Sequence, residues 1–150
     1  MPFTENTKKD YATVMNANMA SLFNITPLAV AEMDKRSSGH VVSVTTTIVD
    51  AAISGIYSVL ATLTKGSLNA ATKSLAIEYA KKGIRVNAVT PRIIKTRMNL
   101  PEAHEMLGAF HPMSRMGEMR DIANAILLLD LAPFVTREIL HVGGGQSAGR

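Results

Sequence analysis

Few side chains in this sequence combine a reactive group with an informative position. Three consecutive threonines, Thr45, Thr46 and Thr47, end an apolar run, where a hydroxyl can hydrogen-bond a substrate carbonyl. β-Branched threonines are also ordinary strand residues, so the run has a purely structural interpretation as well. Asn18 lies on an otherwise apolar helix face, and a buried amide there needs partners, whether a ligand or a backbone carbonyl in a helix bend.

Two further patterns favour ordinary structure over a ligand site. His104 and His111 are seven apart, but no cysteine or carboxylate cluster completes a metal set, and Pro112 interrupts the helix. The sequence therefore predicts no metal site. The glycine cluster at 143–145 follows the last predicted strand with no helix beyond it, which indicates a tail turn rather than a phosphate cradle. His40 and His141 stand beside strands and are interpreted as surface or edge residues.

The elements that position these residues follow from periodicity. Apolar positions three to four apart between 58 and 82 predict a helix, and Lys81 and Lys82 suit its carbonyl end. Gly83 supplies the left-handed residue that closes a helix, and a buried strand follows near 84–90. An earlier helix covers about 9–33, with Pro27 expected to bend it, and further strands are expected near 40–46 and 138–142.

Alternation of helices and strands predicts an α/β fold, a partial Rossmann-type sheet of about three parallel strands flanked by helices. At 150 residues the chain is expected to be a single domain. It has no cysteine, a polar start and no apolar run long enough to span a bilayer, so a cytoplasmic, non-membrane protein is expected. The net charge of +4 is spread in pairs of basic residues, which indicates a solvated surface rather than a nucleic-acid site.

Residues 65–91, KGSLNAATKSLAIEYAKKGIRVNAVTP, resemble the segment after the active site of short-chain dehydrogenase/reductases, the Rossmann-type NAD(P)-dependent oxidoreductases. Four other segments are similar to parts of that family, and they extend the resemblance over nearly the whole chain: DYATVMNANMASLF, SGHVVSVTT, TPRIIKTRM and REILHVGGGQS. The resemblance implies the C-terminal half of the family fold, without the glycine-rich loop that precedes it. A homo-oligomer through the helices near 9–33 and 58–82 is also implied.

The resemblance implies three catalytic residues, Asn18, Thr46 and Lys65. The family pairs its lysine with a tyrosine four positions earlier, where i and i+4 side chains are neighbours on one helix face. Ala61 stands there, so no phenol is available. Tyr57 is eight positions before Lys65, and eight residues turn a helix about 80° beyond two full circles, so its ring is expected off the lysine's face.

The resemblance also implies cofactor contacts from Lys65, Ile94 and Thr96, with NAD or NADP bound weakly or not at all. Arg92 stands where the family has glycine and is expected to be strained if that position needs a positive φ. Arg137 and Gly143 replace the family's usual glycine and aspartate. Three hypotheses follow: an oxidoreductase-family protein impaired as a single chain, a non-enzymatic oligomerising module, or half of an enzyme whose nucleotide-binding half is a separate chain. The substrate stays unknown.

Overall fold

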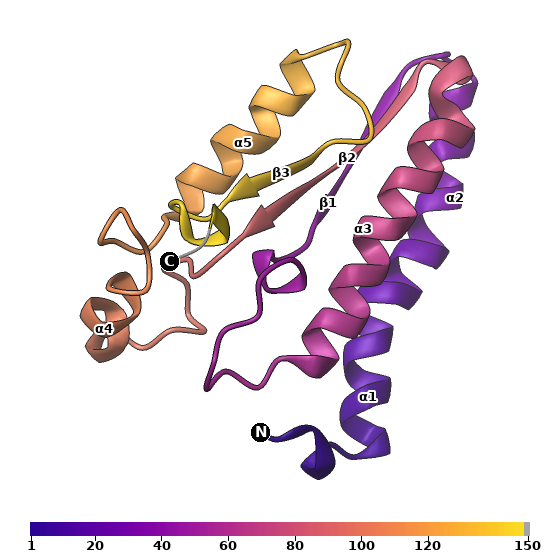
Figure 1. Ribbon diagram of the computed structural model, residues 1–150. Coiled ribbons are helices and arrows are strands. Elements are labelled where there is room, and N and C mark those ends of the chain that lie inside the picture. The colour runs from indigo at the N-terminus through magenta and orange to yellow at the C-terminus, as the bar shows by residue number, and fades with distance from the viewer. Residues whose placement is uncertain (149–150) are drawn as a thin grey trace.

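The computed structural model describes residues 1–148 and contains one parallel sheet between two layers of helices (Figure 1). The strands are β1 (Gly39–Val44), β2 (Ile84–Pro91) and β3 (Ile139–Val142), in the order β1-β2-β3. Both strand pairs are parallel, which confirms the predicted α/β class and the three strand positions. No helix among residues 1–148 is long and apolar enough to cross a membrane.

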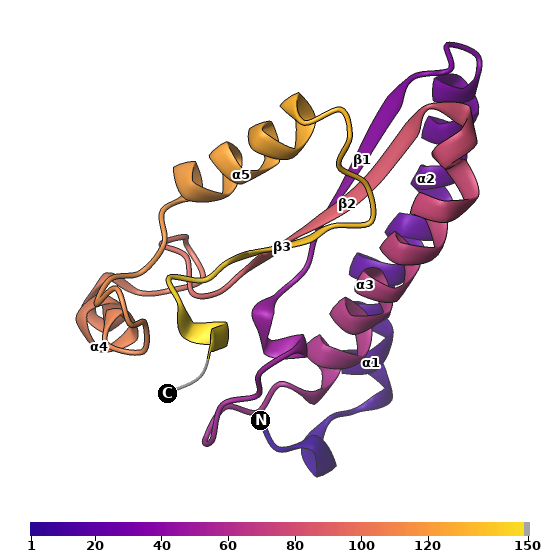
Figure 2. The same ribbon diagram turned by 45° about the horizontal axis from the view of Figure 1, so that its top comes forward.

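The helices α2 (Ser21–Asp34) and α3 (Val59–Tyr79) cover one face of the sheet, and α5 (Met119–Leu131) covers the other (Figures 1 and 2). A short α4 (His104–Gly108) lies beyond the carboxyl end of the strands. The core on the α5 side forms where Ala125 and Leu129 pack against Val89 of β2. On the α3 side, helical spacing brings Thr64, Leu68 and other buried residues onto the sheet-facing side of that helix.

The predicted first helix is longer and more irregular than the sequence indicated. It comprises α1 (Lys8–Met15), a π-helical turn (Asn16–Ala20) and α2, which includes Pro27. Thr7 and Asp10 form a capping box at its start, in which each side chain accepts from the other's backbone amide. The irregularity therefore falls at the turn that contains Asn18, and α-helix continues on both sides of Pro27.

Two polar side chains of β2 connect it to its surroundings. Asn87 reaches β1 and the connection before β3, and Arg85 reaches the end of α5. The Asn87 side chain is fully buried and accepts from the Glu138 amide at 2.9 Å while donating to the Val135 carbonyl at 3.0 Å. It also donates to His40 Nε2 at 2.9 Å. Arg85 donates to the carbonyls of Leu129, Asp130 and Ala132, and so caps the C-terminal end of α5.

His40 lies on the edge strand β1, which agrees with the prediction of a surface or edge residue, but its side chain is not at the surface. Its side chain is 8% exposed and lies between Asn87 and Asp130, whose Oδ1 is 3.1 Å from His40 Nδ1. Because the Asn87 amide nitrogen only donates, His40 Nε2 is the acceptor, and the neutral ring carries its proton on Nδ1 toward Asp130. Burial lowers the pKa of His40 more than the Asp130 hydrogen bond raises it.

Gly83 ends the helical segment with φ 71° after the short 3₁₀ turn Ala80–Lys82, as the sequence predicted. An added Cβ would collide with the backbone carbonyl oxygen of Ser37. That collision and the positive φ both require glycine at this position.

We expect Gly83→Ala to lower the free energy of unfolding by about 2 kcal/mol or more, through left-handed strain and the clash with Ser37. Gly66→Ala is the matched control. Gly66 lies inside α3, and an added methyl there would meet only Val49 Cγ1, at an ordinary contact distance of 3.5 Å. There the same change should stabilise by up to about 1 kcal/mol. Urea unfolding of both variants measures the difference, and equal effects would contradict the assignment.

Candidate functional site

A cavity of about 420 Å³ at the start of α3 collects several of the residues that the sequence singled out. Figure 1 shows the N-terminus close to the connection that leads into this helix. The cavity is lined by Met1, Phe3, Asn6, Val14, Asn18, Tyr57, Ser58, Val59, Leu60, Ala61 and Lys65. The structure therefore brings Asn18, Ala61 and Lys65 together, and the N-terminal residues cover them from one side.

Lys65 is held against the end of β1. Its Nζ donates to the carbonyl oxygen of Val44 at 2.7 Å, across 21 positions of sequence. Burial alone lowers the pKa of Lys65, since no negative partner offsets the loss of solvent. One of the three ammonium N–H groups is used by Val44, which leaves two that a ligand can accept from.

Asn18 meets a hydroxyl rather than a bare backbone carbonyl. Its Nδ2 donates to Thr64 Oγ1 at 3.1 Å, and that hydroxyl donates onward to the Leu60 carbonyl at 3.0 Å. Thr64 is 1% exposed, so the half-buried Asn18 side chain has a buried partner on the helix of Lys65. Asn18 lies in the π-helical turn, an irregularity common at functional sites.

Tyr57 precedes the helix of Lys65. The sequence argument used the helical turn only for the case that the helix reached back to Tyr57, and α3 begins at Val59. Helical angles therefore do not apply to Tyr57, and its side chain lines the same cavity as Lys65 while remaining 66% exposed. Ala61 presents a methyl group at the position where the family has its phenol.

The three threonines have three different environments. Thr45 is buried and its hydroxyl donates to the Val89 carbonyl at 3.4 Å, a role within the sheet. Thr46 Oγ1 accepts from the Ile48 amide at 3.4 Å, and Thr46 is not among the residues that line the Lys65 cavity. Thr47 is 1% exposed and lines a separate cavity together with Arg92.

The residues expected to contact the cofactor do not line one common cavity. Ile94 forms a parallel bridge with Gly117 and lines a cavity of about 500 Å³ at the C-terminal end of the sheet. Thr96 Oγ1 accepts from the Met98 amide at 3.3 Å, in the loop beyond. Lys65 therefore shares a cavity with Asn18, whereas Ile94 belongs to a different one.

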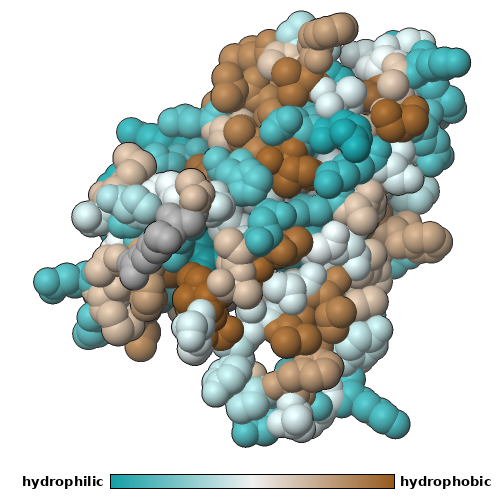
Figure 3. All heavy atoms as spheres, viewed as in Figure 1, coloured by the Kyte–Doolittle hydropathy of each residue, from teal (hydrophilic) through white to brown (hydrophobic). Residues whose placement is uncertain are grey.

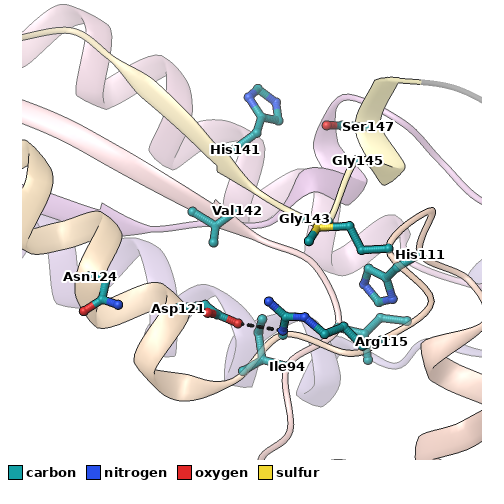
Figure 4. A pocket seen from close by; sticks show the side chains of 14 residues that line it. Ile94, His111, Arg115, Asp121, Asn124, His141, Val142, Gly143, Gly145 and Ser147 are labelled. Carbon is teal, nitrogen blue, oxygen red and sulfur yellow. Dashed lines mark hydrogen bonds and ion pairs between the residues drawn. The ribbon is translucent and has the colours of Figure 1, made fainter.

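The cavity that contains Ile94 is crossed by an ion pair (Figure 4). Arg115 Nη1 lies 3.0 Å from Asp121 Oδ2, at the first turn of α5. The Glu118 amide and then Arg115 lower the pKa of Asp121. His111, 3% exposed, also lines this cavity, and burial lowers its pKa. Residues 1–148 contain no group of three or more potential metal ligands.

The expected strain lies at a different arginine. Among residues 1–148, the non-glycine residues with positive φ are Ser37, Ser114 and Arg137, so Arg92 has an unstrained backbone. Arg137, at the second position where the family usually has glycine, has φ 68°. Its amide nevertheless donates to the Val86 carbonyl at 2.8 Å, which ties the turn before β3 to β2.

Comparison with known proteins decides the family. The family model described as Enoyl-(Acyl carrier protein) reductase matches residues 1–147. A chloroplastic tropinone reductase homologue of Arabidopsis thaliana is 34% identical over 157 residues, covering 97% of this chain and 47% of the relative. The 3-oxoacyl-(acyl-carrier-protein) reductase FabG of Thermotoga maritima is 34% identical over 147 residues, covering 92% of this chain and 57% of the relative.

The chain belongs to the short-chain dehydrogenase/reductase family. The solved structure of ElxO with NADP bound has a TM-score of 0.89 and 31% identity, and the match covers 99% of this chain and 62% of ElxO. This chain spans about half the length of the curated relatives that it matches. As a member of this reductase family it shares the parallel α/β sheet of its structural neighbours.

A pH series of unfolding measurements tests the environment of Lys65. Because burial lowers its folded pKa, the unfolded chain binds more protons between that pKa and about 10.4. We therefore expect the lysine's contribution to make stability rise with pH through this window. Lys65→Met should flatten the rise in urea unfolding, while Lys73→Met, an exposed lysine change on the same helix, should leave it in place. An unchanged slope in Lys65→Met would contradict the burial argument.

Proposed function

We propose that this chain carries the lysine side of a short-chain dehydrogenase/reductase active site and is catalytically impaired when it acts alone. The observation that carries the proposal is Ala61, whose methyl group lines the cavity beside Lys65 and Asn18. Carbonyl reduction needs a positioned proton donor as well as a hydride. Lys65 and Asn18 line the same cavity, but the methyl group of Ala61 has no proton to transfer.

The residues fit a nicotinamide cofactor only in part. The two free N–H groups of Lys65 suit the ribose hydroxyls that the family lysine holds. A dinucleotide also needs a glycine turn before a helix N-terminus for its pyrophosphate. Gly143, Gly144 and Gly145 follow β3, and within residues 1–148 they are followed by the three-residue turn Gln146–Ala148 and not by an α-helix. NAD or NADP binding by this chain is therefore proposed to be weak or absent. When bound, the cofactor supplies the hydride.

Tyr57 does not replace the missing phenol in this proposal. Although it lines the Lys65 cavity, its ring is 66% exposed and precedes the first residue of α3, so the helix does not fix its distance from Lys65. An exposed phenol that the helix does not position beside Lys65 is a poor proton donor, because general acid catalysis requires a positioned group.

We expect the purified chain to show no micromolar binding of NADH or NADPH in a fluorescence titration, and no ketone-dependent NADPH oxidation above background. Ala61→Tyr restores the family spacing to Lys65, and Ala61→Phe adds the ring without the hydroxyl. Neither variant should bind cofactor tightly, because neither supplies a pyrophosphate site. Micromolar binding or unaided turnover by the unmodified chain would refute the proposal. A tyrosine-to-phenylalanine variant of ElxO is described with NADPH bound, so in that protein phenol loss leaves the cofactor in place.

A second proposed role is homo-oligomerisation through the helical face. A groove of about 400 Å³ runs between α2 and α3 and is lined mainly by apolar side chains, including Leu22, Phe23 and Leu75. Phe23 is 78% exposed and Leu28 is 72% exposed on the same helix. Large exposed apolar surfaces of this kind mark interaction sites. Figure 3 shows a further apolar patch over the end of α5, where Leu128, Leu131 and Phe134 are exposed.

We expect light scattering to give at least a dimer mass for the unmodified chain and a smaller mass for Phe23→Glu. The substituted carboxylate would have to be desolvated in a helix-to-helix interface. Met98→Glu is the matched control, because Met98 is 92% exposed in a loop away from this groove. A dilute monomer before any substitution would contradict the oligomer.

A further inference from the structure

A cavity of about 380 Å³, separate from the Lys65 cavity, lies where the connection after β1 meets the segments that follow β2 and β3. Its lining includes Thr47, Ala52, Ile53, Arg92, Phe110 and Gln146. Arg92 and Thr47 flank the same glycine, since a Cβ added at Gly143 would lie 3.4 Å from Arg92 Cβ and 3.4 Å from Thr47 Cγ2. Two side chains from different segments thus lie beside the same glycine and line the same cavity.

Arg92 brings an incompletely paired cation to this wall. Its Nε donates to Gln146 Oε1, but among residues 1–148 its buried Nη1 and Nη2 have no hydrogen-bond partner. Burial lowers the pKa of Arg92, and no neighbouring carboxylate opposes the shift. A guanidinium presents its N–H groups as a fork that matches the two oxygens of a carboxylate.

Thr47 adds a second unpaired polar atom. The residue is only 1% exposed, and its buried Oγ1 has no hydrogen-bond partner within the described chain. Buried hydroxyls and guanidinium groups are expensive to leave unpaired, at about 1–3 kcal/mol for a typical polar group. Two such residues lining one cavity therefore indicate a missing acceptor rather than two unrelated defects.

No aspartate or glutamate of the described chain lines the cavity to supply that acceptor. The carboxylate nearest to Thr47 in the sequence belongs to Asp50, and its Oδ2 lies 3.0 Å from His141 Nε2 instead. The rest of the wall is mostly apolar, through Ala51, Ala52, Ile53 and Phe110. An acceptor that fits both parts carries negative charge at one end and hydrocarbon at the other.

We propose that this cavity binds a small organic carboxylate, with its two oxygens on the Arg92 guanidinium and the Thr47 hydroxyl and its hydrocarbon part against Ile53 and Phe110. The Gln146 amide oxygen, which Arg92 Nε now uses, occupies part of the acceptor position in the free protein. A bound carboxylate displaces it and reaches the buried N–H groups. This binding needs neither a cofactor nor hydride transfer, so it is independent of the proposed function.

Calorimetric titration of the full chain with hexanoate, and with hexanamide as its neutral counterpart, tests the proposal. We expect saturable binding of hexanoate and at least tenfold weaker binding of hexanamide. Arg92→Gln should weaken hexanoate binding at least tenfold, and Thr47→Val should weaken it several-fold. Gln146→Ala removes the competing acceptor and should leave binding equal or tighter.

Arg97→Gln is the matched control, because it removes the same charge from an exposed arginine that does not line the cavity. It should leave hexanoate binding unchanged. If the Arg92→Gln variant does not fold, the Arg92→Lys variant is tested instead. Lysine keeps the charge but lacks the guanidinium's paired N–H donors, so hexanoate binding should still weaken several-fold. Absence of saturable binding, equal binding of hexanamide, or equal weakening by Arg97→Gln would each overturn the proposal. The first result would mean that water alone satisfies the buried groups.

Discussion

The side-chain amide of Asn87 is the interaction on which the arrangement of the sheet depends. One buried group bonds the Val135 carbonyl and the Glu138 amide, both in the connection before β3, and His40 Nε2 on β1. Both backbone partners fix which end of the amide is oxygen, because a carbonyl only accepts and an amide only donates. An apolar residue at 87 would take away the side-chain partner of both backbone groups, so the central strand favours an amide there.

This fixed register places the groups at the carboxyl ends of the strands. Val44 pairs with Val89 at the end of β1, and the Thr45 amide extends the ladder to the Val89 carbonyl at 2.9 Å. The chain then leaves the sheet, so the Val44 carbonyl is free to accept from Lys65. Because the chain leaves the sheet at this point, the Thr45 hydroxyl still bonds within the sheet, whereas Thr47 lines a cavity. The parallel sheet thus concentrates polar groups at one edge, where α/β proteins commonly bind ligands.

Periodicity and turn chemistry were sufficient to predict the elements. The stripe of α3, the left-handed Gly83 and the apolar run of β2 are local signals, and each was found where the sequence placed it. The burial of the His40 side chain was missed because its partners, Asn87 and Asp130, are 47 and 90 positions away. No local pattern reveals a partner at that distance. A polar residue inside an apolar strand, such as Asn87, was the available signal that a buried network existed.

The candidate site was predicted less completely for a similar reason. The sequence singled out Asn18, Ala61 and Lys65 through helix spacing and the family pattern, and the structure places all three in one cavity. Tyr57 lies in the connection before α3, where helical spacing gives no orientation, so the sequence could not place its side chain in that cavity. The strain expected at Arg92 occurs at Arg137, since φ at a loop residue is set by the segments on both sides of it. The unpaired ends of Arg92 had no signature in the sequence.

The parallel pairing has a consequence for how this chain reaches its native state. Gly39 pairs with Ile84 and Ala88 pairs with Ile139, which are 45 and 51 positions apart. None of these three strands forms a hairpin with the next, so each pairing requires a long loop to close first. Such topologies fold slowly compared with helical bundles. During synthesis the strand at 39–44 leaves the ribosome some forty residues before β2, its partner in this structure, and in this interval self-association can compete with that pairing.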